Sequence, residues 1–228
     1  MAGWGEFAAA GLAFMASHAI PALPRLKAWL VARLGARGYG IAFGLLALVL
    51  LFWLIYAAGR APFVQLWPQA GWMRWLVNLS MPVVIALSAF GIAAPNPFAF
   101  EGLAKGYTPA RPGIAGLTRQ PLLWALALWS AVHLLANGDL AHAILFGGFL
   151  AFSLLGMRAM EARLRRNWGA AEFDRLAAQT SLLPLATLIS GRWRPQGAPS
   201  WRRLGLAALA WAVLWYGHAP VIGVSPAP

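Results

Sequence analysis

Residues 39–59 form a run, YGIAFGLLALVLLFWLIYAAG, that contains no charged side chain. As a helix, this run is long enough to cross the hydrocarbon core of a bilayer. Because no water reaches that core, every backbone amide must be paired within the chain, and only helices and closed barrels achieve this. The apolar residues come in long runs, without the alternation of a barrel strand. The run therefore predicts a membrane-spanning helix.

The rest of the chain has the same character. Its 228 residues are 61% hydrophobic and only 11% charged, which is too apolar for an ordinary soluble domain. We therefore expect an all-α, polytopic membrane protein with about six transmembrane helices, and one domain over residues 1–228. The candidate spans are about 4–22, 39–59, 72–94, 121–136, 140–157 and 204–219.

The basic residues predict the orientation of these spans. Sixteen of the 18 lie after the first span, in residues 95–120, or in residues 158–203. Only Arg60 and Arg74 fall on the other side. Since positive loops stay in the cytoplasm, both termini are expected in the periplasm of a bacterial inner membrane. The formal charge of +12 then reflects topology, and we expect no nucleic-acid partner.

Residues 156–181 combine apolar residues at helical spacing with arginines. Met157, Met160, Leu164 and Trp168 recur on one side of the expected helix. This pattern predicts an amphipathic helix on the cytoplasmic leaflet, within an interfacial segment of about 158–203, with membrane lipids as its partners. A solvated, charged linker is the alternative interpretation.

Two of the four histidines lie within apolar spans. His142 and His218 lie near the ends of their spans, where a side chain can reach the interface. His18 and His133 are deeper, and a polar side chain in a bilayer is a functional hypothesis by default. After His18, Pro21 and Pro24 are expected to end or bend the first helix.

Two intramembrane histidines with aromatic neighbours suit a haem, because neutral imidazole is an iron ligand and the porphyrin is apolar. Trp129 and Asn137, one turn before and after His133, are expected to wall the site and orient its ring. Arg119 or Arg25 is expected to pair with the propionates. The alternative for each histidine is a structural bond to a helix carbonyl.

Other chemistries have little support in the sequence. Without cysteine, the chain has no thiolate ligand, thiol nucleophile or disulfide. No Asp or Glu lies deep within a predicted span, which argues against a proton pump. Neither a glycine-rich phosphate loop nor a metal-spaced His/Glu motif is present.

Three stretches resemble the NnrU family of bacterial inner-membrane proteins, whose superfamily includes zeta-carotene isomerase. They are SHAIPALPRLKAWLVARLGARGYG (17–40), GLTRQPLLWALALWSAVHLLANGDLAHAILFGGFLAFSLLGMR (116–158) and WGAAEFDRLAAQTSLLPLATLISGR (168–192). In the isomerase branch, two histidines bind haem b, and a cis double bond of a carotene becomes trans when the iron is reduced. The resemblance implies that His18 and His133 are these ligands. Where members of the family usually have the motif Arg-His-Pro, this chain has Gln120 in place of the histidine.

The resemblance implies a haem b protein that performs cis–trans isomerisation, or another redox reaction, on a polyene or other lipid-soluble substrate. A second hypothesis is a membrane methyltransferase that uses S-adenosylmethionine. Such enzymes carry Arg-His-Pro before an aromatic-rich helix and acidic residues further on, where this chain has Glu161 and Glu172. A third is a non-enzymatic accessory protein of denitrification.

Reporter fusions test the orientation. Fusions after Arg37, Lys105 and Arg166 should report the cytoplasm, and a fusion after Arg60 should report the periplasm, because short positive loops orient the spans. Paired phosphatase and fluorescent reporters measure each side. A periplasmic signal at Arg166 would overturn the arrangement.

Overall fold

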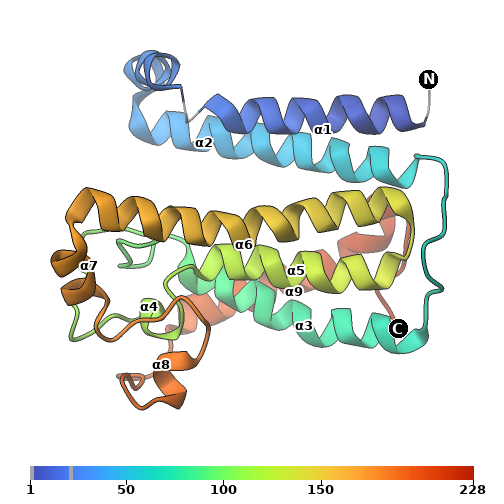
Figure 1. Cartoon of the computed structure of the whole chain (residues 1–228). Helices are drawn as coiled ribbons and strands as arrows, with labels where there is room; N and C mark the ends of the chain where they lie inside the picture. The colour runs from blue at the N-terminus through green and yellow to red at the C-terminus, as the bar shows by residue number, and fades with distance from the viewer. Residues whose placement is uncertain (1–2, 21–22) are drawn as a thin grey trace. The chain divides into compact units, whose positions relative to one another are not determined.

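The computed structural model describes residues 3–20 and 23–228, which fold into helices joined by loops (Figure 1). No β-strand is present in these ranges, so the all-α class is confirmed. The helices, in chain order, are α1 (Trp4–Ala19), α2 (Pro24–Gly59), α3 (Gly71–Gly91), α4 (Ile114–Leu117), α5 (Pro121–Asn137), α6 (Leu140–Trp168), α7 (Ala170–Ala177), α8 (Ala186–Ile189) and α9 (Trp201–Ile222).

Each of the six predicted spans falls on a helix, namely α1, α2, α3, α5, α6 or α9. Four of these helices, α2, α3, α6 and α9, are long and apolar enough to cross a membrane. The shorter α1 and α5 have 16 and 17 residues, fewer than the roughly 20 residues of an upright crossing. The membrane character of the chain therefore agrees with the sequence, while the number of six crossings stays a prediction.

The basic stretch after the first span, which was expected to be a loop, is helical. Helix α2 begins at Pro24, whose fixed φ suits the first helical turn, and it carries Arg25 and Lys27. Gly35 interrupts it with φ 70° and ψ 162°, a conformation that glycine adopts without strain. A basic helical segment thus precedes the long apolar one. The predicted effect of Pro21 lies outside the described residues.

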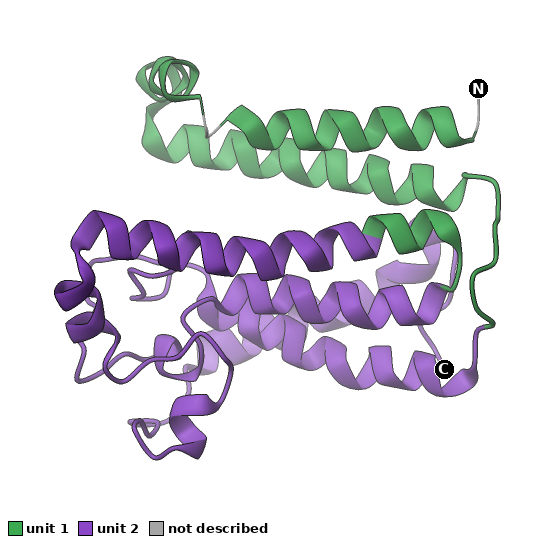
Figure 2. Cartoon of the chain, in the orientation of Figure 1, with its two compact units in different colours: residues 1–68, 138–145 green, residues 69–137, 146–228 purple. Residues whose placement is uncertain are grey.

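The chain divides into two compact units, coloured green and purple in Figure 2. Unit 1 consists of residues 1–68 and 138–145, and unit 2 of residues 69–137 and 146–228. In unit 1, α1 packs on α2, and Ala10 of α1 and Ala57 and Ala58 of α2 are at most 2% exposed. Small side chains of this kind let two apolar helices approach closely.

Unit 2 is built around α3 and α5, which pack along each other, with α9 also against α3. Val84 and Leu87 of α3 form a buried cluster with Ala125 of α5. Leu123 and Ala127 of α5 form a second one with Met157 of α6. A third cluster, Phe98, Ala115 and Phe173, joins the loop before α5 to α7. These clusters position the polar residues at the start of α5.

The expected amphipathic segment is divided between two helices. α6 continues the apolar span without a break as far as Trp168, and Gly169, at φ 82°, separates it from α7. Met157, Leu164 and Trp168 of the apolar stripe pack into the clusters of unit 2. This apolar face therefore contacts the protein itself, because it is covered by α7 and by the loop that precedes α5.

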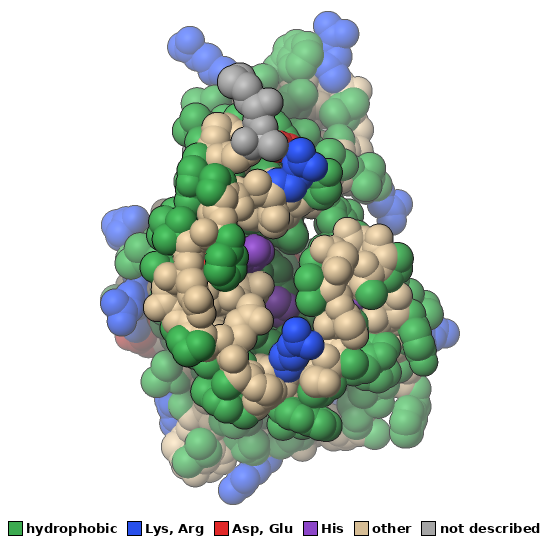
Figure 3. All heavy atoms as spheres, turned by 90° about the vertical axis from the view of Figure 1, so that its right-hand side faces the viewer, with side chains coloured by type: hydrophobic (Ala, Val, Ile, Leu, Met, Phe, Trp, Pro, Cys, Tyr) green, Lys and Arg blue, Asp and Glu red, His purple; other side chains and the backbone are tan. Residues whose placement is uncertain are grey.

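Many large apolar side chains are exposed, as expected for a surface that meets lipid. The exposed fraction of Val49 in α2 is 64%, and that of Leu209 in α9 is 61%. No residue of α9 is buried. On the face viewed in Figure 3, hydrophobic side chains cover much of the surface and acidic ones are sparse. Such large apolar exposure is typical of membrane proteins.

Gly91 tests the packing of α3 on α5. An added Cβ at this residue would lie 2.7 Å from Cγ of Pro121, whose ring cannot swing away. We expect Gly91→Ala to lower the free energy of unfolding by about 1–3 kcal/mol, measured as a loss of thermal stability in detergent. Gly205→Ala on α9 is the control, since nothing lies within 4 Å of its added Cβ. Equal stability of the two variants would contradict this packing.

Candidate functional site

His18 lies in the last turn of α1, and its own helix holds its ring. Nδ1 is 2.8 Å from the carbonyl oxygen of Phe14 and 3.1 Å from Oγ of Ser17. The imidazole stacks on Phe14, with 4.1 Å between ring centroids, and meets Phe43 of α2 edge-on at 5.5 Å. The ring is therefore fixed in orientation between aromatic neighbours of unit 1.

His133, on α5 in unit 2, has closely similar surroundings. Its Nδ1 lies 2.8 Å from the carbonyl oxygen of Trp129, one turn earlier. The ring centroids of Trp129 and Phe146 each lie 5.3 Å from that of His133. Trp129 thus lies against this histidine and supplies the acceptor for the ring nitrogen. Its role in walling a haem site stays a prediction.

These bonds define the tautomer of both rings. A carbonyl oxygen only accepts hydrogen bonds, so Nδ1 carries the proton in each neutral imidazole and Nε2 carries the lone pair. Histidines that bind metals have this arrangement, because the N–H of the nitrogen away from the metal donates to a carbonyl or carboxylate. The donor chemistry of His18 and His133 therefore fits haem iron. The same bond also satisfies a structural histidine. Since the two residues lie in different units, their pairing stays a prediction.

The other two histidines lie at helix ends. His142 is in the first turn of α6, where Oδ1 of Asp139 accepts from its backbone N–H at 3.1 Å and Oδ2 lies 2.7 Å from its Nδ1. His218 is near the end of α9, with Nδ1 2.7 Å from the carbonyl oxygen of Val224. Both bonds secure a helix end, which is a structural role.

Asn137 contacts His133 differently from the sequence prediction. The side-chain amide of Asn137 donates to the backbone carbonyl of His133 at 2.8 Å, and the backbone carbonyl of Asn137 accepts from Nε2 of Gln69. Residues four apart lie on one helix face, so the short amide side chain reaches the carbonyl one turn back. Orientation of the ring through Nδ1 therefore belongs to Trp129, and Asn137 secures the end of α5.

The two arginines expected at the propionates lie in different settings. Arg25 is exposed in the first turn of α2. Arg119 comes just before α5, and the fourteen-residue separation from His133 is about 20 Å along a helix. That separation argues against Arg119 as the propionate partner of a haem on His133.

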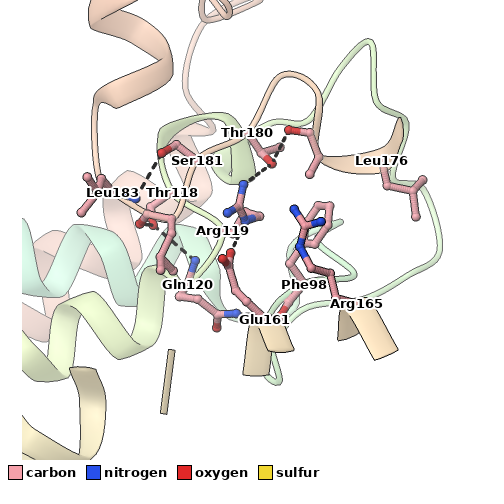
Figure 4. Close-up of polar contacts among 12 residues, drawn as sticks. Phe98, Thr118, Arg119, Gln120, Glu161, Arg165, Leu176, Thr180, Ser181 and Leu183 are labelled. Atoms are coloured by element: carbon pink, nitrogen blue, oxygen red, sulfur yellow. Dashed lines mark hydrogen bonds and ion pairs between the residues drawn. The ribbon is translucent and has the colours of Figure 1, made fainter. Parts of the chain in front are cut away.

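Arg119 is held by unit 2 in a polar network at the start of α5 (Figure 4). Its Nε donates to the carboxylate of Glu161 on α6, and its Nη1 donates to Oγ1 of Thr180 at 3.2 Å. The guanidinium also lies 5.8 Å from the ring centroid of Phe98 and 5.6 Å from that of Phe173. Contacts on several sides fix the direction of this cation.

Fully buried amides hold the backbone around Arg119. Nδ2 of Asn96 donates to the carbonyl of Arg119 at 3.0 Å, and Nε2 of Gln120 donates to the carbonyl of Phe98 at 2.8 Å. Oε1 of Gln120 is buried without a hydrogen-bond partner among the described residues. Gln120 thus has a structural role, since it joins the start of α5 to the loop at Phe98. Oδ1 of Asn96 accepts from the backbone N–H of Phe98 at 3.1 Å, a local bond. Its bond to Arg119, 23 residues further along the chain, has no sequence signal.

Two ionisable groups of the neighbouring loop are shifted by burial. Burial raises the pKa of Glu101, whose Oε1 accepts from the backbone N–H of Leu122 while Oε2 has no partner in the described chain. Burial also raises the pKa of Tyr107 to about 12, although the positive charge of Arg119 acts to lower it. The hydroxyl of Tyr107 donates to the carbonyl of Leu176. Both groups pack the loop onto α5 and α7.

No group of three or more His, Asp or Glu side chains within residues 3–20 and 23–228 is arranged to hold a metal ion. A haem needs at most two axial ligands from the protein, so this finding does not bear on the haem hypothesis.

The comparisons with known proteins gave one match. The model of a protein family described as "NnrU protein" matches residues 6–226, nearly the whole chain. Neither a curated protein nor a solved structure matches.

The charge of Glu101 is expected to cost stability. The pKa of Glu101 is higher in the folded than in the unfolded chain. Its carboxyl group therefore stabilises the fold fully below the unfolded pKa, and this stabilisation is lost as the pH rises through the folded pKa. Glu101→Gln keeps an acceptor for Leu122 and removes the charge. We expect its melting temperature to exceed the wild-type value by about 2–4 °C at neutral pH, and the difference to vanish below about pH 4. Thermal unfolding across pH measures this.

The exposed Glu172, whose pKa the hydrogen bond to Arg175 lowers, supplies the control Glu172→Gln. A gain of stability at neutral pH in this variant, or none in Glu101→Gln, would contradict the explanation by burial.

Proposed function

The chain belongs to the NnrU family, and from this premise we propose that it is an integral inner-membrane protein that binds haem b through His18 and His133. The observation that supports this most is the shared environment of the two rings. Each Nδ1 bonds a carbonyl one helical turn back, which leaves the lone pair on Nε2, and each ring has aromatic neighbours. An apolar porphyrin suits such walls.

The haem would supply the chemistry, which is cis–trans isomerisation of a polyene or a redox reaction on another lipid-soluble substrate. The protein's residues then have simpler tasks. The carbonyls of Phe14 and Trp129 hold the two imidazoles in the ligating tautomer. The ring of Trp129, 5.0 Å from that of Phe146, keeps the surroundings of His133 apolar and excludes water.

We further propose six crossings with both termini in the periplasm. The apolar helices, four of them long enough to span, support this, as does the concentration of basic residues in three regions. The short α1 and α5 would cross beside longer partners, α2 and α3. Arg158 and Arg166, exposed on α6, would meet the anionic headgroups of the cytoplasmic leaflet.

The methyltransferase alternative has weaker support. The acidic residues that it invokes are each paired with an arginine, Glu161 with Arg119 and Glu172 with Arg175. Glu172 is also on the exposed surface of α7, away from any buried site. A non-enzymatic accessory protein of denitrification remains the alternative if no haem binds.

Absorption spectroscopy of the purified protein tests the haem proposal. We expect a Soret band in the wild type, and its loss or a clear shift in His18→Ala and in His133→Ala, because each removes an axial nitrogen. His218→Ala is the matched control, since its ring secures the end of α9. A colourless wild type that takes up no added haem would refute the proposal, and so would unchanged spectra in both variants.

A further inference from the structure

A polar pocket of about 310 Å³ lies beside Arg119 in unit 2. Three arginines and one aspartate line it, so the lining carries a charge of +2. Two hydroxyl residues, Thr180 and Ser181, complete the polar part of the lining. The pocket involves neither His18 nor His133, and its residues come from the start of α5, the end of α6, α7 and the chain that follows. The charged lining residues are Arg119, Arg165, Arg192 and Asp174.

Two of the arginines are held in place by aromatic and acidic partners. The guanidinium carbon of Arg165 lies 4.5 Å from the ring centroid of Phe173, the ring that Arg119 also contacts at 5.6 Å. Asp174 accepts from Nη2 of Arg165 at 2.6 Å, much as Glu161 accepts from Nε of Arg119. Both cations are therefore oriented before any ligand arrives, which lowers the entropic cost of binding.

These partners leave hydrogen-bonding capacity on the arginines. A guanidinium has five N–H donors, and the bonds of Arg119 within the described residues engage Nε and Nη1. Nη2 and its two hydrogens remain. Arg192 donates through Nε to Oγ of Ser190, and it has no ion pair with an acid of the described chain. Of the three pocket arginines, Arg192 is therefore the one whose charge no acidic side chain of the described residues neutralises.

We propose that this pocket binds a phosphate group, as a phosphate ester in solution or as the headgroup of an anionic phospholipid. Planar guanidinium groups match the tetrahedral oxygens of phosphate better than ammonium groups do. The hydroxyl of Ser181 can add a further donor, since that of Thr180 already donates to the carbonyl of Ala177 at 3.0 Å. A volume of about 310 Å³ is at the small end for ligand pockets, so it suits a headgroup or a small ester. The ring of Phe173 lies against both Arg119 and Arg165.

Titration calorimetry of the full-length protein in detergent, with inorganic phosphate and glycerol 3-phosphate, tests the proposal. We expect saturable binding to the wild type, and about tenfold weaker binding for Arg192→Gln, which loses charged hydrogen bonds but no buried contact. Arg163→Gln is the matched control. This substitution also removes one positive charge, but from an exposed residue of α6 that does not line the pocket. The affinity of this variant for phosphate should therefore equal that of the wild type.

Absence of saturable binding to the wild type would overturn the proposal, as would equal losses in Arg192→Gln and Arg163→Gln. Nanodiscs separate the two sources of phosphate. If the ligand is a headgroup, phosphatidic acid in the disc weakens the binding of glycerol 3-phosphate, while the same negative charge supplied as oleate does not. If it is a soluble ester, the two discs give the same affinity. Either result supports the phosphate site, and neither depends on haem.

Discussion

Polar side chains in the apolar helices must form their hydrogen bonds with the chain itself, because neither lipid nor apolar side chains offer a partner. The structure meets this constraint in one recurring way. His18 and His133 bond the carbonyl four residues back, and Ser88 and Ser153 do the same at 2.9 and 2.8 Å. For serine this bond only removes a cost. For histidine it also selects the tautomer, so the bond that stabilises the residue places the lone pair on its second nitrogen, which is the atom that our haem proposal uses.

Beyond the helix ends the same constraint is met by tertiary contacts. Asn96 and Gln120, both fully buried, bond backbone carbonyls of the loop and of the start of α5, and Thr118 donates to the carbonyl of Leu182 at 2.9 Å. These bonds fix the backbone on both sides of Arg119. Its guanidinium then meets Glu161 and the aromatic rings, and the polar pocket follows from that placement.

The sequence could predict what depends on local periodicity. All six apolar segments are helical, and Trp129 lies beside His133, because both features follow from the spacing of residues along one helix. It could not predict the break at Gly35 or the division between α6 and α7, since a glycine is tolerated inside helices elsewhere in the same chain. It also missed the partner of Arg119, because Glu161 lies 42 residues away and no periodicity links the two. In the sequence, Arg165 and Arg192 indicate only the orientation of the spans and a basic interfacial segment, since their common pocket exists only after α7 folds back on the loop.

Helix α5 connects the two proposed sites that involve unit 2. Arg119 stands just before its first turn and His133 stands near its C-terminal end, about 20 Å further along. Pro121 lies against Gly91 of α3, and the buried clusters continue this packing along α5, so the helix has little freedom to slide or rotate. A phosphate near Arg119 would be more than a Debye length from His133. Any effect of one ligand on the other would therefore require α5 to move as a body against α3, and the close contact at Gly91 opposes that motion. We infer that the two sites act independently.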